Sequence, residues 1–416
     1  MRILHFSDLH LGVETHGRVD PSTGLHTRVR DFVRSLGFLC SVAIEEAVDL
    51  VLFTGDLYKN CDPTPTHQRE FATQVRALQR AGIPLVMIVG NHDLPAAFGK
   101  ATSLDIFATL EVEGTRVVRT PQMVTVPTAS GPLQVAGLPW PSRHNLRAHE
   151  SYKDLSQEET TRAIEQICTA QIEEFACLRE PESPAILAGH LAASAATYSG
   201  SERSALIGSD PTFLTGVLAN SAFDYVALGH VHRFQDLNPT ATPPVVYAGS
   251  IERVDFSEEN EEKGFCLVEI AQVEEGGWKS SYEFVPTPAR RFVTVAVDAE
   301  NQRDPTAAVV AAIKSESIAD AVVRLQYTVA RDAKPVDAAA LHTALSSAHW
   351  VAGIQPQVAA EVRERRAAVT GDLDLADALD RYIANNPGLA DHRHKLHACA
   401  LELEQARLTD DREISG

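Results

Sequence analysis

Five short apolar runs constrain the fold more than any other feature of the sequence, because each is followed within a few residues by Asp, His or Asn. The runs occupy residues 3–6, 50–53, 85–89, 186–188 and 225–228. A short, continuous apolar run predicts a strand that is buried on both faces. A further run at 245–247 has the same character, and the stretches between the early runs, such as 66–81, are amphipathic. This alternation of strands and helices predicts an α/β layer fold.

The polar residues that follow these runs form a candidate site. They are SDLH at 7–10, TGD at 54–56, GNHD at 90–93, GH at 189–190 and GHVH at 229–232. Any one of these residues is an ordinary turn or helix-capping residue, but five strand ends of the same kind are not expected by chance. Ligands bind beyond the carboxyl ends of strands in open α/β sheets, and a glycine there lets the backbone turn sharply. We therefore expect a binding site at these strand ends.

The side chains at these strand ends have the chemistry of a two-metal site. The candidate ligands are Asp8, His10, Asp56, Asn91, His190, His230 and His232. Oxygen and imidazole donors without thiolate suit Mn²⁺, Fe, Zn²⁺ or Mg²⁺. Seven donors exceed a tetrahedral site and suit two ions that share a carboxylate, an arrangement that hydrolyses phosphate esters. Next to Asn91, His92 is expected to face the substrate, where it would protonate the leaving oxygen or stabilise the phosphate in the transition state. Asp93 is expected to cap a helix or stabilise the turn.

Composition narrows the class of protein further. A chain of 416 residues predicts about two or three domains. Its net charge of −19 argues against gripping nucleic acid by net charge alone, but leaves open a local basic groove or a partner. The six cysteines form no CxxC pair, which favours free thiols over disulfides or structural zinc. The N-terminus lacks the pattern of a signal peptide and no apolar run approaches about 18 residues, so we expect a cytoplasmic protein without a membrane span.

The pattern of predicted strands and helices changes after residue 285. Residues 284–291, FVPTPARR, predict a linker. Apolar runs at 292–297 and 321–329 surround a helical stretch at 305–313, which predicts a small α/β domain over 286–350. Residues 351–416 are polar and helical, with NNPG at 385–388 between two helices, and predict a hairpin. The acidic run SEENEEK at 257–263 is expected to be a solvated turn.

The ordered motifs DLH, GD, GNHD, GH and GHVH resemble the calcineurin-like metallophosphoesterase superfamily. MRILHFSDLHLG at the N-terminus, GDLYKNCDPTP at 55–65 and YAGSIERVDFSEENEEKGF at 247–265 are similar to its Mre11/SbcD group of DNA-repair nucleases. The resemblance implies a nuclease domain over 1–285, built as a β-sandwich flanked by helices. It also implies a DNA-contacting capping domain over 286–350 and an ATPase-binding helical segment over 351–416. Protein phosphatases of the superfamily carry a second Asp and an Arg after GD, and GDLYKN has neither.

The resemblance also implies roles for the candidate residues. Asp8, His10 and His232 would hold one ion, Asn91, His190 and His230 the other, and Asp56 would bridge them. His92 would be the catalytic histidine, and the ions would be Mn²⁺. Some relatives place a histidine three residues after the bridging Asp, where this chain has Lys59, so the resemblance assigns no role to that side chain.

The partners implied are DNA, a second copy of the chain and an SbcC/Rad50-like ABC ATPase. The homodimer would use helices near 66–81 or 102–110. The ATPase would bind the C-terminal helices, and it would supply ATP hydrolysis because this chain has no Walker A motif. The implied activity is ATP-dependent exonuclease on double-stranded DNA and endonuclease on single-stranded DNA. The residues alone leave open a free-standing metallophosphoesterase that acts on a small phosphodiester or phosphomonoester, although such an enzyme does not need the residues after 285.

Overall fold

The computed structural model describes residues 1–95, 99–200, 210–274, 276–359, 375–384 and 386–402. The chain divides into two compact units, Met1–Gln357 and Val358–Gly416, which are described separately. Among the described residues, no helix combines the length and apolar character that crossing a membrane requires.

Two six-stranded sheets form the body of the first unit. The first sheet has, in spatial order, β14 (Trp278–Pro286), β13 (Gly264–Gln272), β1 (Arg2–Phe6), β2 (Leu50–Phe53), β3 (Leu85–Ile88) and β4 (Thr115–Val118). The second has β11 (Gln235–Asp236), β12 (Val245–Tyr247), β10 (Tyr225–Gly229), β7 (Ala185–His190), β6 (Gly131–Leu138) and β5 (Gln122–Thr128). Strands β1 to β4 are parallel, as are β6, β7, β10 and β12. The predicted α/β fold class and β-sandwich are confirmed.

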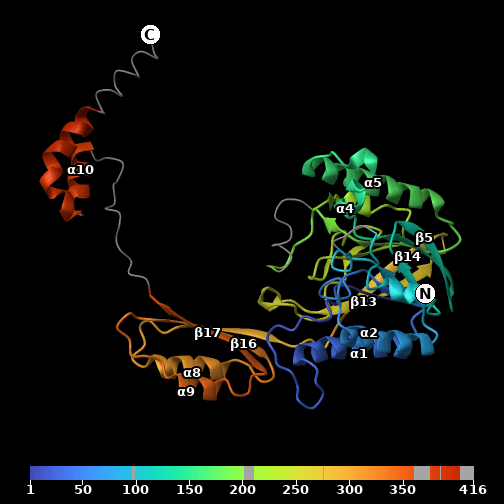
Figure 1. Cartoon of the computed structure of the whole chain (residues 1–416), viewed down its shortest axis with the longest axis horizontal. Helices are drawn as coiled ribbons and strands as arrows, with labels where there is room; N and C mark the ends of the chain where they lie inside the picture. Colours follow the sequence, from blue (N-terminus) through green and yellow to red (C-terminus); the bar gives the residue numbers. More distant parts are fainter. Residues whose placement is uncertain (96–98, 201–209, 275, 360–374, 385, 403–416) are drawn as a thin grey trace, which may run out of the picture. The chain divides into compact units, whose positions relative to one another are not determined.

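Helices cover the outer faces of both sheets (Figure 1). The helices α1 (Thr27–Glu45) and α2 (Pro65–Arg80) lie on the first sheet, and α5 (Gln157–Leu178) lies on the second. Alternate residues of one strand enter different layers, because successive side chains of a strand point to opposite faces. In β1, Ile3 packs between the sheets and Leu4 packs under α1 and α2. The predicted apolar runs are therefore buried on both faces, and the strand ends reach one edge of the sandwich.

Shorter elements complete this part: α3 (Asp105–Thr109), α4 (Arg143–Arg147), η1 (Glu150–Tyr152), β8 (Ala192–Ala193), β9 (Thr212–Phe213), α7 (Thr215–Leu218) and η2 (Phe256–Glu258).

A small three-stranded sheet closes the first unit. It consists of β15 (Phe292–Asp298), β16 (Val322–Val329) and β17 (Trp350–Val358), with α8 (Pro305–Ser315) and α9 (Ala338–Ala344) against it. Val295, Val309 and Leu341 belong to a separate apolar core. The predicted strands and helix are confirmed, but the predicted linker at 284–291 is wrong at its start, since β14 continues through Pro286 as part of a sheet. The domain boundaries at 286 and 350 stay a prediction.

The second unit contains α10 (Leu375–Ala384) and η3 (Pro387–His392), followed by helical residues at 393–402. The carboxylate of Asp380 in α10 accepts hydrogen bonds from Arg393, at 3.0 Å, and from His397, at 2.6 Å, which ties the two helical stretches together. The helix break predicted at NNPG is confirmed, because α10 ends before the motif and η3 begins at Pro387. The rest of the predicted segment, 360–374 and 403–416, lies outside the described residues.

Candidate metal centre

The carboxyl ends of β1, β2, β3, β7 and β10, with the loops that follow them, meet at one edge of the sandwich and bring all seven predicted donors together. Three groups of side chains have potential ligand atoms within 4.8 Å of one another: Asp8, His10 and His232; Asp8, Asp56 and His190; His10, Asp56 and His92. Because β1 and β2 belong to one sheet and β7 and β10 to the other, the site needs both sheets. The sequence pattern placed these residues at strand ends, and the structure shows that the strand ends share an edge.

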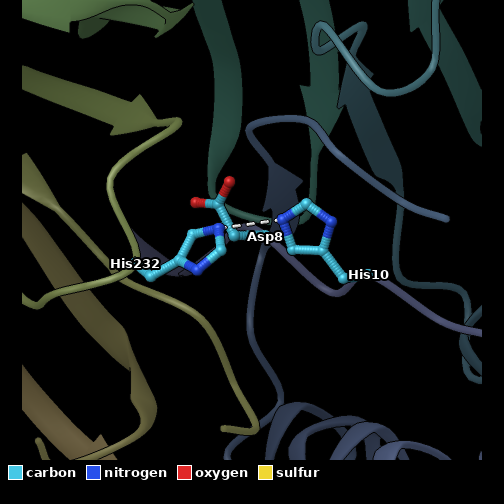
Figure 2. Close-up of side chains that lie close together, drawn as sticks. All are labelled: Asp8, His10 and His232. Atoms are coloured by element: carbon cyan, nitrogen blue, oxygen red, sulfur yellow. Dashed lines mark hydrogen bonds between the residues drawn. The ribbon is translucent and has the colours of Figure 1, made fainter. Parts of the chain in front are cut away.

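Asp8, His10 and His232 form one half of the site (Figure 2). The Nε2 atoms of His10 and His232 face each other at 2.9 Å. Burial is the largest influence on His10, and with the neighbouring His232 ring it holds the pKa of His10 well below its ordinary value. The backbone N–H of His230 donates to the Asp8 carboxylate at 3.1 Å, which fixes that carboxylate beside the rings.

Asn91, His190 and His230 form the other half. Asn91 Oδ1 lies 2.9 Å from His190 Nε2 and 3.1 Å from His230 Nδ1. His190 Nδ1 lies 2.7 Å from the carbonyl oxygen of Thr54. A carbonyl can only accept, so His190 Nδ1 donates to Thr54 and Nε2 is turned toward Asn91 and Asp56. A backbone acceptor of this kind orients metal-binding histidines in general.

Asp56 lies between the two halves. Its Oδ2 is 3.4 Å from His190 Nε2 and 3.8 Å from His10 Nε2. Burial alone would raise the pKa of Asp56, but His190, His92 and His10 outweigh it and hold the pKa well below its usual range. Burial lowers the pKa of His190, and Asp56 and Asp8 raise it to about 9. Asp56 is therefore a buried carboxylate whose charged form is stabilised by the imidazole rings around it.

The donor set fits divalent cations. Carboxylate and imidazole atoms approach one another in the first half, and amide and imidazole atoms do so in the second, at points where they can all act as electron-pair donors. Such hard and borderline donors suit Mn²⁺, Zn²⁺, Fe or Mg²⁺, and the cluster is compatible with a dinuclear site. The assignment of individual side chains as ligands stays a prediction.

The backbone at the site is held in an unusual conformation. Asp8, His10, Asp56 and His230 have positive φ angles of 51°, 46°, 62° and 98°. Such angles cost non-glycine residues on the order of 1 kcal/mol or more and persist only where the surroundings enforce them. Gly90 shows how tight the packing is, because a Cβ atom there would lie 2.2 Å from Asp56 Oδ1.

Asp93 is one of the groups that hold this backbone in place. Its buried carboxylate accepts from the N–H groups of Gly90, Asp56 and Leu57 at 2.8, 3.0 and 3.0 Å. Burial and the nearby Asp56 raise the pKa of Asp93 to about 6, although these hydrogen bonds oppose the rise. Asp93 stabilises its own turn, as expected, through the N–H group of Gly90. It also connects this turn to the loop that carries Asp56.

The ring of His92 is exposed and is oriented by the backbone of the neighbouring loop. Its Nδ1 lies 2.9 Å from the carbonyl oxygen of Lys59, and its backbone N–H donates to Asp56 Oδ1 at 2.8 Å. Its ring centroid is 4.9 Å from that of His10. His92 therefore stands at the rim of the cluster, where a substrate can reach it.

Glu258 is a site residue that the sequence pattern did not reveal. The run SEENEEK was expected to be a solvated turn, and this is wrong for Glu258 and Lys263, which are buried. Glu258 Oε1 lies 2.7 Å from His232 Nδ1, and Lys263 Nζ lies 2.9 Å from Glu258 Oε2. Burial would raise the pKa of Glu258, but Lys263 and His232 hold it well below its usual range. The one signal in the sequence that could have indicated a site residue here was that the run lies within 247–265, the segment that resembles the Mre11/SbcD group.

Comparison with known proteins agrees with this geometry. The family model described as calcineurin-like phosphoesterase matches residues 1–234. The SbcD subunit of the nuclease SbcCD from Bacillus subtilis is 29% identical over 281 residues, which cover 67% of this chain and 68% of that protein. The SbcD subunit from Escherichia coli K12 is 28% identical over 274 residues, 64% of each chain. The DNA double-strand break repair protein Mre11 of Sulfurisphaera tokodaii is 35% identical over 97 residues, 23% of each chain. The family match spans more than half of the 416 residues, and the chain belongs to the calcineurin-like phosphoesterase family of metal-dependent phosphoester hydrolases.

Proposed function

We propose that the chain is the nuclease subunit of an SbcCD-type complex and hydrolyses DNA phosphodiesters with two Mn²⁺ ions. The observation that carries the proposal is the meeting of seven oxygen and imidazole donors at one edge of the sandwich, with His92 at its rim. The similarity to the SbcD subunits of two bacteria over about two thirds of the chain supports DNA as the substrate class.

The residues divide between two cation sites. In this proposal Asp8, His10 and His232 hold one ion, and Asn91, His190 and His230 hold the other. Asp56 serves both, since its Oδ2 lies near a histidine of each half. When bound, two such ions supply Lewis-acid chemistry: they neutralise charge on a phosphate and make water a better nucleophile.

His92 acts on the leaving group. Its Nδ1 is committed to the Lys59 carbonyl, which leaves Nε2 to meet the substrate. In the imidazolium form, Nε2 carries the proton that the departing oxygen takes when its bond to phosphorus breaks. The exposed position of the ring at the rim suits this task.

The remaining parts of the chain have partner roles in the proposal. The small sheet is the capping domain that contacts DNA, and a second copy of the chain completes a homodimer. The C-terminal helices bind an SbcC/Rad50-like ABC ATPase, and Leu375, Tyr382 and Leu401 support this because they are apolar and more than 40% exposed. A net charge of −19 is consistent with a partner that supplies much of the grip on DNA.

The test is a nuclease assay on the purified chain with Mn²⁺, on linear duplex DNA, single-stranded DNA and bis-p-nitrophenyl phosphate, with and without a candidate ATPase. We expect DNA degradation that requires Mn²⁺ and is lost in His92→Ala. Turnover of the small ester with DNA untouched under all conditions would contradict the proposal and favour a free-standing phosphoesterase.

A further inference from the structure

One segment of the first unit contacts both the metal centre and the small sheet. Residues 253–263, here called the strap, leave the sandwich after β12, form η2 and return at β13. Two consecutive glutamates of the strap make these contacts. Glu258 contacts the candidate metal ligand His232, and Glu259 contacts β15 of the small sheet.

The contact with the metal centre is a buried carboxylate–imidazole pair. Glu258 Oε1 lies 2.7 Å from His232 Nδ1, on the side of the ring opposite the Nε2 that faces His10. Lys263, at the end of the strap, donates both to Glu258 and, at 3.0 Å, to the carbonyl oxygen of His232. The strap therefore fixes the ring and the backbone of His232 together.

The contact with the small sheet is equally specific. The Glu259 carboxylate accepts from the backbone N–H and the Oγ1 hydroxyl of Thr294 in β15, each at 2.5 Å. Arg324 of β16 donates to Thr294 Oγ1 at 2.9 Å, and its guanidinium carbon lies 4.3 Å from the ring centroid of Phe256 in η2. Hydrogen bonds from Glu259 and a cation–π contact from Phe256 therefore fasten η2 and the residue after it to two strands of the small sheet.

We infer that the strap is a positioning element through which the small sheet sets the metal affinity of the half-site made by Asp8, His10 and His232. This rests on the proposed function, because it takes those three residues as ligands. Glu258 orients His232 and fixes which ring nitrogen is available to the ion, which is what carboxylate partners of ligand histidines do. Glu258 and Glu259 are adjacent on one short turn, so a shift of the small sheet at Thr294 moves the carboxylate that holds the ring.

The strap is expected to affect one ion and not the other. The other half-site is held by different contacts, since Asn91 Oδ1 meets the rings of His190 and His230, and the carbonyl of Thr54 orients His190. A substrate or partner that displaces the small sheet would then alter one metal site selectively.

The test is calorimetric titration of Mn²⁺ into the full metal-free chain, where wild type is expected to bind two ions. Glu258→Gln should weaken one of the two sites by roughly 10- to 100-fold, and Glu259→Ala should weaken the same site by about 3- to 10-fold. Thr294→Val removes the hydroxyl but keeps the backbone N–H that also donates to Glu259, so it should weaken the same site by less than Glu259→Ala does. Thr294→Ser, which keeps the hydroxyl, should bind both ions with wild-type affinity. Glu262→Ala is the matched control, since Glu262 is an exposed glutamate of the same strap.

A second readout does not depend on bound metal. The ¹⁵N resonances of the His232 ring in metal-free protein report which nitrogen carries the proton. We expect them to shift in Glu258→Gln and Glu259→Ala and to stay unchanged in Glu262→Ala. If Glu259→Ala and Thr294→Val match Glu262→Ala in both measurements, the inference is overturned while the proposed function stands. If wild type binds no Mn²⁺, the proposed function fails and the inference about metal affinity fails with it.

Discussion

The carbonyl oxygen of Lys59 lies 2.9 Å from Nδ1 of His92, so a backbone atom orients the ring proposed to donate the catalytic proton. A carbonyl only accepts hydrogen bonds, so this contact fixes Nδ1 as a donor and leaves Nε2 for the substrate. The same device appears deeper in the site, where the carbonyl of Thr54 accepts from His190 Nδ1 at 2.7 Å. The residues that follow β2 thus orient two histidines through their backbone.

Replacing the ring tests its role directly. We expect His92→Ala to lower the rate of DNA hydrolysis by about 10²- to 10⁴-fold, the usual contribution of a general acid. Both Mn²⁺ ions should still bind, because His92 is not one of the seven proposed ligands. Steady-state hydrolysis and Mn²⁺ calorimetry on the same preparation measure the two effects.

The control is the neighbouring lysine. Lys59→Ala keeps the backbone carbonyl that holds His92 and removes an exposed side chain, so we expect activity close to wild type. A near wild-type rate in His92→Ala would remove this residue from the mechanism. A large loss in Lys59→Ala would show that the lysine side chain itself meets the substrate.

The position of Asp56 between the half-sites predicts how its loss differs from the loss of a one-sided ligand. Asp56→Ala should weaken both Mn²⁺ ions, and His232→Ala only one, in each case by more than the roughly 10- to 100-fold cost of losing a group that merely orients a ligand. Bound Mn²⁺ per chain after dialysis, measured by atomic emission, separates these outcomes. Asp62→Ala, which changes an exposed aspartate in the same connection between β2 and α2, should bind two ions. If Asp56→Ala and His232→Ala each lost only one Mn²⁺ ion per chain, Asp56 could not bridge the two ions.

The sequence predicted the strands and their ends because both follow from local chemistry. A run such as 50–53 is apolar at every position since both faces of β2 are covered, Leu52 by the second sheet and Phe53 by the helices. Asp56 and Asn91 then follow at the strand ends, where polar groups and glycine are needed to turn the chain. The seven donors were therefore visible as a repeated local pattern.

Contacts between distant segments were not visible. The pairing of β1 with β13 joins Arg2 to Glu269, and no local pattern specifies a pairing across such a separation. The prediction for Glu258 was wrong because a run of acidic residues ordinarily faces solvent. Its burial is possible because Lys263 and His232 pair with its carboxylate. The positive φ angles of Asp8 and His10 were also hidden, because Asp and His adopt such angles more often than most residues but still at only a small fraction of their positions.

The carboxylate of Asp93 predicts a stability effect. Asp93→Ala would leave three buried N–H groups, those of Gly90, Asp56 and Leu57, without their acceptor. Each unsatisfied donor costs about 1–3 kcal/mol, so we expect the free energy of unfolding to fall by roughly 3 kcal/mol or more. Urea denaturation in the presence of EDTA measures this without a contribution from bound metal. Asp62→Ala should leave the midpoint unchanged, and a similar midpoint in Asp93→Ala would show that water replaces the carboxylate.

A buried ion pair between α1 and the start of the small sheet predicts a pH dependence of stability. The Asp31 carboxylate accepts from Arg290 at 2.6 Å through two guanidinium nitrogens and from Arg28 at 2.7 Å. Burial would raise the pKa of Asp31, but Arg290 and Arg28 outweigh it and hold the pKa below its ordinary value. Since the pKa is lower in the folded chain than in the unfolded one, this carboxylate stabilises the fold above the unfolded value of about 4 and loses that contribution as pH falls through the folded value.

Asp31→Asn should therefore destabilise the protein at pH 7 by about 3 kcal/mol, because it removes one carboxylate from two buried guanidinium groups. Arg290 keeps Asp320 and Arg28 keeps Glu252, at 2.6 and 3.6 Å, which limits the loss. The difference from wild type should be constant between about pH 5 and pH 7 and should shrink below about pH 4, where wild type begins to lose the same charge. Urea unfolding across this range, followed by the fluorescence of Trp350 in β17 in a background that carries Trp140→Phe and Trp278→Phe, measures the difference at the small sheet. Glu45→Gln, an exposed change on the same helix, should match wild type at every pH. A difference between Asp31→Asn and wild type that stays the same down to pH 3 would mean that hydrogen bonding by the Asp31 side chain, and not its charge, joins α1 to Arg290.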